Sequence, residues 1–265
     1  MATYPRIVIG ADGSADTATA VELGAWLGAR LAVPVTVVTV WDGFTNVPEP
    51  QSFDWARSVT VAAADVVRAA GVTDVTTEEP TGIAADILIK IATADPEILL
   101  VVGGRSLSSA KDRVVGSVAN RLSHHSPADV LFATKPTTTG WGAVGLTTDG
   151  SATSREAVRR GLRLALAVDA QPHLVTVAKD EEEGERLMAA SIGELVLDEP
   201  CLAPTQDILI GLLPAKAIIE ASVNYDLLVI GNRSMSGPSR LMGSVANKVT
   251  HGVETNLLLV NTSRD

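Results

Sequence analysis

Two short motifs occur twice in this chain, and their polar and small residues are more typical of a ligand-binding site than of a hydrophobic core. Asp-Gly-Ser stands at 12–14 and again at 149–151, each time after an apolar run. Gly-Ser-Val-Ala-Asn stands at 116–120 and again at 243–247, 127 positions later. An apolar run, a Gly and an x-Arg-Ser also precede both copies of the pentapeptide. Because these features recur in the same order, we interpret the chain as a tandem duplication.

Either motif alone is also an ordinary structural feature, Asp-Gly-Ser a turn and Gly-Ser a helix N-cap, but together they predict a nucleotide site. Gly116 and Ser117 open a predicted helix, where unpaired N–H groups and the positive end of the helix dipole suit a phosphate. Ser117 adds a hydroxyl, and Gly103, at the end of the preceding strand, lets the backbone approach a ligand closely. Asp12 can accept hydrogen bonds from ribose hydroxyls. The chain has neither GxxxxGK[ST] nor GxGxxG, so this is not a P-loop or a dinucleotide fingerprint.

The elements that must position these motifs alternate along the first repeat. We predict strands at 6–10, 35–41, 72–78, 98–102 and 129–133, and helices from Ser14 or Asp16 to Ala32 and at 55–71, 83–94 and 117–125. Apolar strands that alternate with helices indicate an α/β fold with a parallel sheet covered on both faces. Ligands bind beyond the carboxyl ends of such strands. If the first and fourth strands are neighbours, the two loops face each other across one crevice.

Composition limits the class of protein. The repeat boundary near 136–140 predicts domains at 1–137 and 138–265, and the second repeat lacks nine residues in its middle and one in its loop. The formal net charge of −10 argues against binding to nucleic acid or to an anionic membrane. The lone Cys201 fits a reducing compartment. We see no signal peptide and no apolar run of membrane-spanning length, so we expect a cytoplasmic protein.

These residues and motifs resemble the universal stress protein family in its tandem, two-repeat form. The resemblance implies two tandem five-stranded parallel-sheet domains, Rossmann-like and similar to adenine-nucleotide alpha-hydrolases, in a pseudo-two-fold arrangement. It also implies ATP, with or without magnesium, with its phosphates at the glycine loop, its ribose near the Asp after the first strand, and its adenine beside the end of the second strand. Carried over by position, the first site comprises Asp12, Val40, Gly103, Arg105, Ser106, Gly116, Ser117 and Val118, and the second comprises Asp149, Val177, Gly231, Arg233, Ser234, Gly243, Ser244 and Val245.

The chain departs from the family pattern in its glycine loops. Ser106 and Ser234 stand where the family has its second glycine, and a left-handed backbone there would cost serine about 1 kcal/mol or more. The second loop is one residue shorter and contains Pro238, so we expect the first site to be the stronger. Arg105 and Arg233 can each reach a phosphate or pair with a surface acid, and both readings stay open.

The function expected from the sequence is that of an ATP-binding, nucleotide-responsive regulator in a stress response. No nucleophile–base pair occurs in both halves, so we do not expect an enzyme. Slow ATP turnover is still compatible with such a site. The alternative is an interaction or oligomerisation module of the same fold that has lost nucleotide binding, which the serines in the loops favour. An enzyme on the related scaffold would need a catalytic domain or metal cluster that the sequence does not show.

Two further expectations concern metals and partners. His124 and His125 stand near the end of a predicted helix, where a cation is favoured by the helix dipole, so we predict no metal site there. The fifth strands, at 129–134 and 256–261, would each lie at a sheet edge, and apolar edges tend to be covered or paired. We therefore predict an intrachain pseudo-dimer through the fifth strands, and leave open whether whole chains form a homodimer.

Overall fold

The chain forms two compact units, Met1–Thr138 and Thr139–Asp265. The computed structural model describes residues 3–41, 52–104, 118–137, 140–198, 204–232 and 242–262, and for 194–198 it describes the backbone alone. Within these ranges, no helix has both the length and the apolar character needed to cross a membrane.

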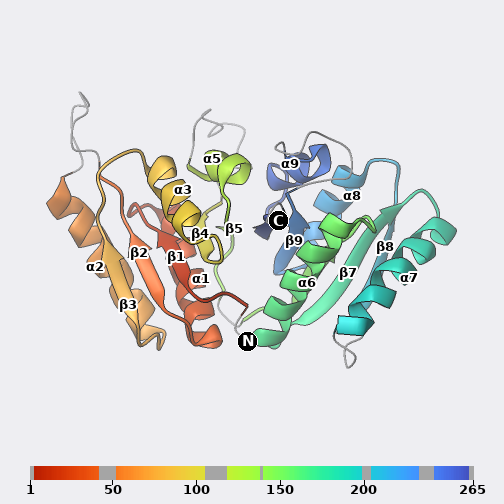
Figure 1. The fold of residues 1–265 in the computed structure, drawn as a ribbon, viewed down its shortest axis with the longest axis horizontal. Coiled ribbons are helices and arrows are strands. Elements are labelled where there is room, and N and C mark those ends of the chain that lie inside the picture. Colours follow the sequence, from red (N-terminus) through yellow and green to blue (C-terminus); the bar gives the residue numbers. More distant parts are fainter. Residues whose placement is uncertain are drawn as a thin grey trace. The chain divides into compact units, whose positions relative to one another are not determined.

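Unit 1 is a parallel sheet with helices on both faces (Figure 1). Its strands are β1 (Ile7–Gly10), β2 (Val35–Val38), β3 (Val75–Glu78), β4 (Leu99–Gly103) and β5 (Asp129–Ala133), in the spatial order β3-β2-β1-β4-β5. Its helices are α1 (Ala15–Leu31), α2 (Phe53–Ala69), α3 (Ala84–Ala94) and α5 (Val118–His125). Ile9 faces Gly24 of α1, whereas the next residue, Gly10, faces Leu88 of α3. Since successive strand residues face opposite sides, α1 and α3 cover opposite faces of the sheet.

Unit 2 repeats this architecture (Figure 1). Its strands are β6 (Ala143–Thr147), β7 (Gln171–Ala178), β8 (Thr205–Ile210), β9 (Leu227–Gly231) and β10 (Asn256–Val260), in the order β10-β9-β6-β7-β8. Its helices are α6 (Ala152–Ala167), α7 (Glu181–Asp198), α8 (Pro214–Ala221), the short η1 (Ser222–Asn224) and α9 (Ser244–Thr250). All strand pairs within both units are parallel. The predicted α/β fold with two five-stranded parallel sheets is confirmed. The pairing of the fifth strands and the pseudo-two-fold arrangement stay predictions.

The Asp-Gly-Ser motif builds the same turn in both units. Gly13 and Gly150 have φ angles of +77° and +76°, a left-handed backbone that glycine adopts without strain. The following serine is the N-cap of a helix. The Ser14 hydroxyl accepts from the Thr17 N–H at 3.3 Å, and the Ser151 hydroxyl accepts from the Ser154 N–H at 3.1 Å. The motif therefore has a structural role in each unit, whether or not a ligand is bound.

The second strand of unit 1 is shorter than the sequence predicts. It ends at Val38, which is opposite Gly10, the last residue of β1. The Ala11 N–H donates to the Val38 carbonyl at 2.9 Å, and β1 offers no partner beyond that point. The prediction that the strand continues unbroken to Trp41 is wrong: β2 ends at Val38, and Trp41 returns only to an isolated bridge with Thr81 on the side of β3.

The nine residues missing from the second repeat lie between its second strand and the following helix. Val175 follows Val38 by 137 positions, and the two carbonyls accept equivalent hydrogen bonds from Thr148 and Ala11. Leu187 follows Val59 by only 128 positions, although these two side chains lie against the equivalent glycines of the Asp-Gly-Ser turns. Helix α7 consequently begins three residues after β7 ends.

A glycine at the same place in each unit lets the first helix pack closely on the sheet. A Cβ on Gly161 of α6 would lie 2.9 Å from Cγ1 of the buried Val229. We expect Gly161→Ala to lower the free energy of unfolding by about 1–3 kcal/mol, because the stiff valine cannot yield easily. Gly193→Ala in α7, where a Cβ would meet nothing within 4 Å, should instead raise it by about 0.5–1 kcal/mol. Urea denaturation of both variants checks the opposite signs; equal effects would contradict the close packing.

Candidate functional site

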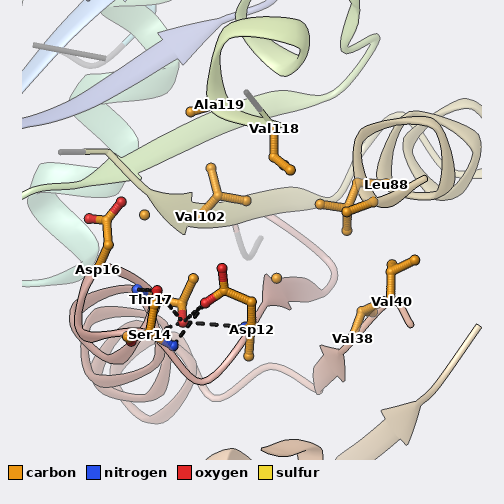
Figure 2. Close-up of a pocket in the computed structure, with 14 residues that line it drawn as sticks. Asp12, Ser14, Asp16, Thr17, Val38, Val40, Leu88, Val102, Val118 and Ala119 are labelled. Atoms are coloured by element: carbon orange, nitrogen blue, oxygen red, sulfur yellow. Dashed lines mark hydrogen bonds between the residues drawn. The ribbon is translucent and has the colours of Figure 1, made fainter. Parts of the chain in front are cut away.

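A pocket of about 270 Å³ opens in unit 1 at the carboxyl ends of β1, β2 and β4 (Figure 2). Parallel sheets bind ligands at this edge, where connections from neighbouring strands leave in opposite directions. The strand order places that point between β1 and β4, which pair directly. The adjacency that the sequence argument required is therefore present. The volume lies just below the roughly 300–1,000 Å³ typical of small-molecule sites.

Four of the predicted site residues line this pocket. Asp12 comes from the turn after β1, Val40 follows β2, Gly103 ends β4, and Val118 begins α5. Their roles toward a ligand stay predictions. The other four residues predicted for the first site lie outside the described residues; they are Arg105, Ser106, Gly116 and Ser117.

Asp12 is oriented by hydrogen bonds within its own turn (Figure 2). Its Oδ1 accepts from the Ser14 N–H at 2.9 Å and from the Thr17 hydroxyl at 2.7 Å. Its Oδ2 accepts no hydrogen bond from the part of the chain that the structure describes, so it is available to a ligand. Burial raises the pKa of the Asp12 carboxyl, but the bonds from Ser14 and Thr17 outweigh it and leave the pKa below its usual value. Asp12 is therefore an anionic acceptor at neutral pH.

The pocket has an apolar end and an acidic end. Figure 2 shows Val38, Val40 and Leu88 together on one side, with Asp16 on the other and Asp12 between them. A Cβ on Gly103 would lie 2.6 Å from Oδ2 of Asp16, so the carboxylate packs directly against the glycine. Only a residue without a side chain leaves room for it.

The sequence argument missed several of these lining residues. Thr17 carried a signal, because a hydroxyl residue stands five positions after the Asp in both repeats, with Ser154 in the second. Asp16 carried none, since the second repeat has Thr153 in its place. Leu88 lies on α3, and only the tertiary structure shows that this helix borders the pocket.

The equivalent region of unit 2 differs at the end of its first strand. Thr147 stands where unit 1 has Gly10, and its hydroxyl donates to the Val229 carbonyl at 2.9 Å. A Cβ on Gly10 would lie 3.3 Å from both Leu88 Cδ1 and Val102 Cγ1, two residues that line the pocket. Unit 2 therefore has a side chain at a position that unit 1 leaves empty.

The residues predicted for the second site come from the equivalent elements of unit 2, with two differences from the first site. Asp149 accepts from the Ser151 N–H at 3.0 Å, but the Ser154 hydroxyl donates to the Ser151 carbonyl instead. Val177 lies inside β7, paired with Leu209, and not beyond the strand as Val40 does. Gly231 ends β9, Gly243 is the N-cap of α9, and Ser244 and Val245 begin that helix. Arg233 and Ser234 lie outside the described residues.

The described residues hold no group of three or more His, Cys, Asp or Glu side chains that could bind a metal ion. Taken together, these features define an α/β protein with a pocket at the carboxyl edge of a parallel sheet. The model of the universal stress protein family matches residues 3–133 and 214–261. The chain belongs to the universal stress protein family.

Individual proteins agree with this assignment. A putative universal stress protein of Staphylococcus haemolyticus is 30% identical over 140 residues, which span 49% of this chain and 85% of the relative. A putative universal stress protein of Staphylococcus aureus is 31% identical over 140 residues, spanning 49% of this chain and 84% of the relative. The crystal structure of a universal stress protein from Archaeoglobus fulgidus covers 98% of this chain and 99% of its own, with a TM-score of 0.76 at 18% identity. This last similarity shows that the two-unit fold is shared over the full length.

The hydroxyl of Thr17 should control the acidity of Asp12. We expect Thr17→Val to raise the pKa of the Asp12 carboxyl, because the variant loses the shortest bond to Oδ1. A carboxyl whose pKa is lower in the folded than in the unfolded protein stabilises the fold at pH values above its unfolded pKa, near 3.8. This contribution is lost as the pH falls through the folded pKa. The variant should therefore lose part of its stability at neutral pH.

An NMR titration of the Asp12 carboxyl carbon measures this effect. Thr19→Val is the control, because Thr19 lies on the same helix and its hydroxyl donates to the Ala15 carbonyl instead. An Asp12 pKa that stays the same in Thr17→Val would show that the hydroxyl does not hold the carboxylate.

Proposed function

We propose that unit 1 binds an adenine nucleotide, with ATP as the expected ligand, and that nucleotide occupancy regulates the protein in a stress response. The observation that carries the proposal is the single pocket that gathers Asp12, Val40, Gly103 and Val118 from four separate segments. The family match supports it, because the first matched range contains all four residues.

The pocket suits the three parts of a nucleotide in turn. An adenine ring would pack at the apolar end against Val38, Val40 and Leu88. The free Oδ2 of Asp12, midway along the pocket, would accept hydrogen bonds from ribose hydroxyls. The phosphates would then extend toward Gly103 and the start of α5, where backbone N–H groups favour an anion.

Binding fits this pocket better than catalysis. Its described lining has no His, Cys, Lys or Arg, and of its two hydroxyl residues, Ser14 and Thr17, Thr17 donates its proton to the Asp12 carboxylate within the turn at 2.7 Å. We therefore propose a regulator and not an enzyme. Regulation requires that ATP bind one state of the protein more tightly than another, so that occupancy changes which state prevails.

Several features of unit 2 favour a function other than nucleotide binding. Thr147 and the internal position of Val177 both disfavour a matching pocket, and the second range of the family match begins only at 214, after Asp149 and Val177. In addition, Leu212 and Leu213 are 84% and 65% exposed between β8 and α8. Exposed apolar side chains are typical of interaction surfaces. These features favour the second candidate, an interaction module, for unit 2.

We expect one nucleotide per chain, held by unit 1. Isothermal titration calorimetry with ATP should give a stoichiometry near one. Asp12→Ala should weaken binding about tenfold to a hundredfold, as expected for the loss of a hydrogen bond to a charged group. Asp149→Ala is the matched control, since it removes the equivalent carboxylate of unit 2 and should leave the affinity and the stoichiometry unchanged.

Each other outcome has a definite meaning. A stoichiometry near two, with one site lost in each variant, would show that unit 2 also binds nucleotide. If neither titration nor mass spectrometry of the purified protein detects a nucleotide, the proposal fails, and the interaction module becomes the leading function for the whole chain.

A further inference from the structure

A second cavity of unit 1 lies in the groove between helices α1 and α2, which pack side by side. Its volume is about 410 Å³, within the range of roughly 300–1,000 Å³ typical of small-molecule sites. Most of its described lining consists of Ala and Val side chains. The groove meets the nucleotide pocket at three shared residues, Ala11, Ser14 and Thr17. The proposed nucleotide function leaves this groove without a role.

The groove runs along α1. At one end Val59 of α2 lies against the Asp-Gly-Ser turn, with its Cγ2 3.2 Å from a Cβ built on Gly13. Glu22 also lines the groove, eight residues after the N-cap Ser14, which is about 12 Å further along the helix. Val66 of α2, another lining residue, is 43% exposed. A ligand that fills this groove is therefore elongated and largely apolar.

Glu22 is the one charged side chain in the described lining of the groove. It is exposed, and it forms no ion pair or hydrogen bond with the residues that the structure describes. A cation with a hydrocarbon body can pair with this carboxylate and cover the apolar wall at the same time, so it gains from both. The lining therefore favours a cation over an anion, and an amphiphilic cation over a small hydrated one.

Unit 2 carries cations of its own at the equivalent positions. Three lining residues of the groove, Ala18, Glu22 and Ser58, correspond to Arg155, Arg159 and Arg186. The Arg155 guanidinium donates to the Gly150 carbonyl at 2.8 Å, so it reaches back to the Asp-Gly-Ser turn of unit 2. The Gly13 carbonyl has no such donor, because Ala18 has no polar side chain. Unit 1 thus has an acid and open space where unit 2 has basic side chains.

We propose that the α1–α2 groove of unit 1 binds a small amphiphilic cation, a primary aliphatic amine. Its ammonium group pairs with Glu22, and its carbon chain lies along Val21, Val59 and Val66. Glu22 selects for positive charge, and the apolar walls select for a hydrocarbon body. This site is distinct from the nucleotide pocket and does not depend on nucleotide binding.

An NMR titration of the full chain with hexylammonium chloride tests the site, because backbone amide shifts locate the ligand and also give its Kd. We expect saturable binding with the largest shifts at 17–22 and 58–66. Two other probes separate charge from hydrocarbon. Hexanol has the same body without the charge, and methylammonium has the charge without the body. Each should bind about fivefold more weakly than hexylammonium, or weaker still.

Three variants assign the contacts. Glu22→Gln should raise the Kd of hexylammonium about twofold to fivefold, as expected for the loss of an exposed charge pair, and leave that of hexanol unchanged. Ala18→Arg introduces the residue of unit 2 into the groove and should abolish the binding of both. Ala18 and Glu22 are both exposed, so neither change disturbs the core. Asp65→Asn on α2, outside the lining, makes the same change in net charge as Glu22→Gln and should leave both Kd values unchanged.

The contrary results are equally specific. Binding that does not saturate, or the largest shifts outside α1 and α2, would overturn the site. An unchanged hexylammonium Kd in Glu22→Gln, or hexanol binding as tightly as hexylammonium, would overturn the selection for a cation. An equal loss in Asp65→Asn would do the same, since net charge alone would then explain the effect. None of these results bears on the nucleotide pocket, which the ATP titration tests separately.

Discussion

The parallel pairing of β1 with β4 is the constraint on which the rest of the candidate site depends. These strands lie about 90 residues apart in the chain, yet Ile9 is directly opposite Val101. Parallel strands end at the same edge of a sheet, so the pairing brings the Asp12 turn and Gly103 to one place. The chain leaves β1 and β4 toward opposite sides, which opens the space between them. Neither loop forms a pocket by itself.

The two units show how a duplicated scaffold can keep its fold while its site diverges. Both keep the Asp-Gly-Ser turn, the serine N-cap and the glycine that lets the first helix approach the sheet. They differ at two positions that line the pocket, where Gly10 is replaced by Thr147 and Asp16 by Thr153, although Asp12, Val40, Gly103 and Val118 have identical equivalents in unit 2.

A repeated motif is therefore weaker evidence for two sites than the sequence alone suggests. Asp12 and Asp149 both accept a hydrogen bond from the N–H two residues later, which stabilises the turn. Only Asp12 also accepts from a hydroxyl on the following helix, at 2.7 Å from Thr17. Asp-Gly-Ser thus forms the same turn in both units. The neighbouring residues determine whether the Asp carboxylate is also held toward a pocket.

The sequence by itself determined the order of strands and helices, the duplication and the positions of Asp12 and Gly103, because hydrophobic patterning and turn residues act locally along the chain. It misjudged the end of β2, which stops at Val38 because its neighbour β1 ends opposite, at Gly10. It could not reveal Leu88 or Asp16 as pocket residues. Their place depends on how α1 and α3 pack on opposite faces of the sheet, and only the tertiary structure decided that.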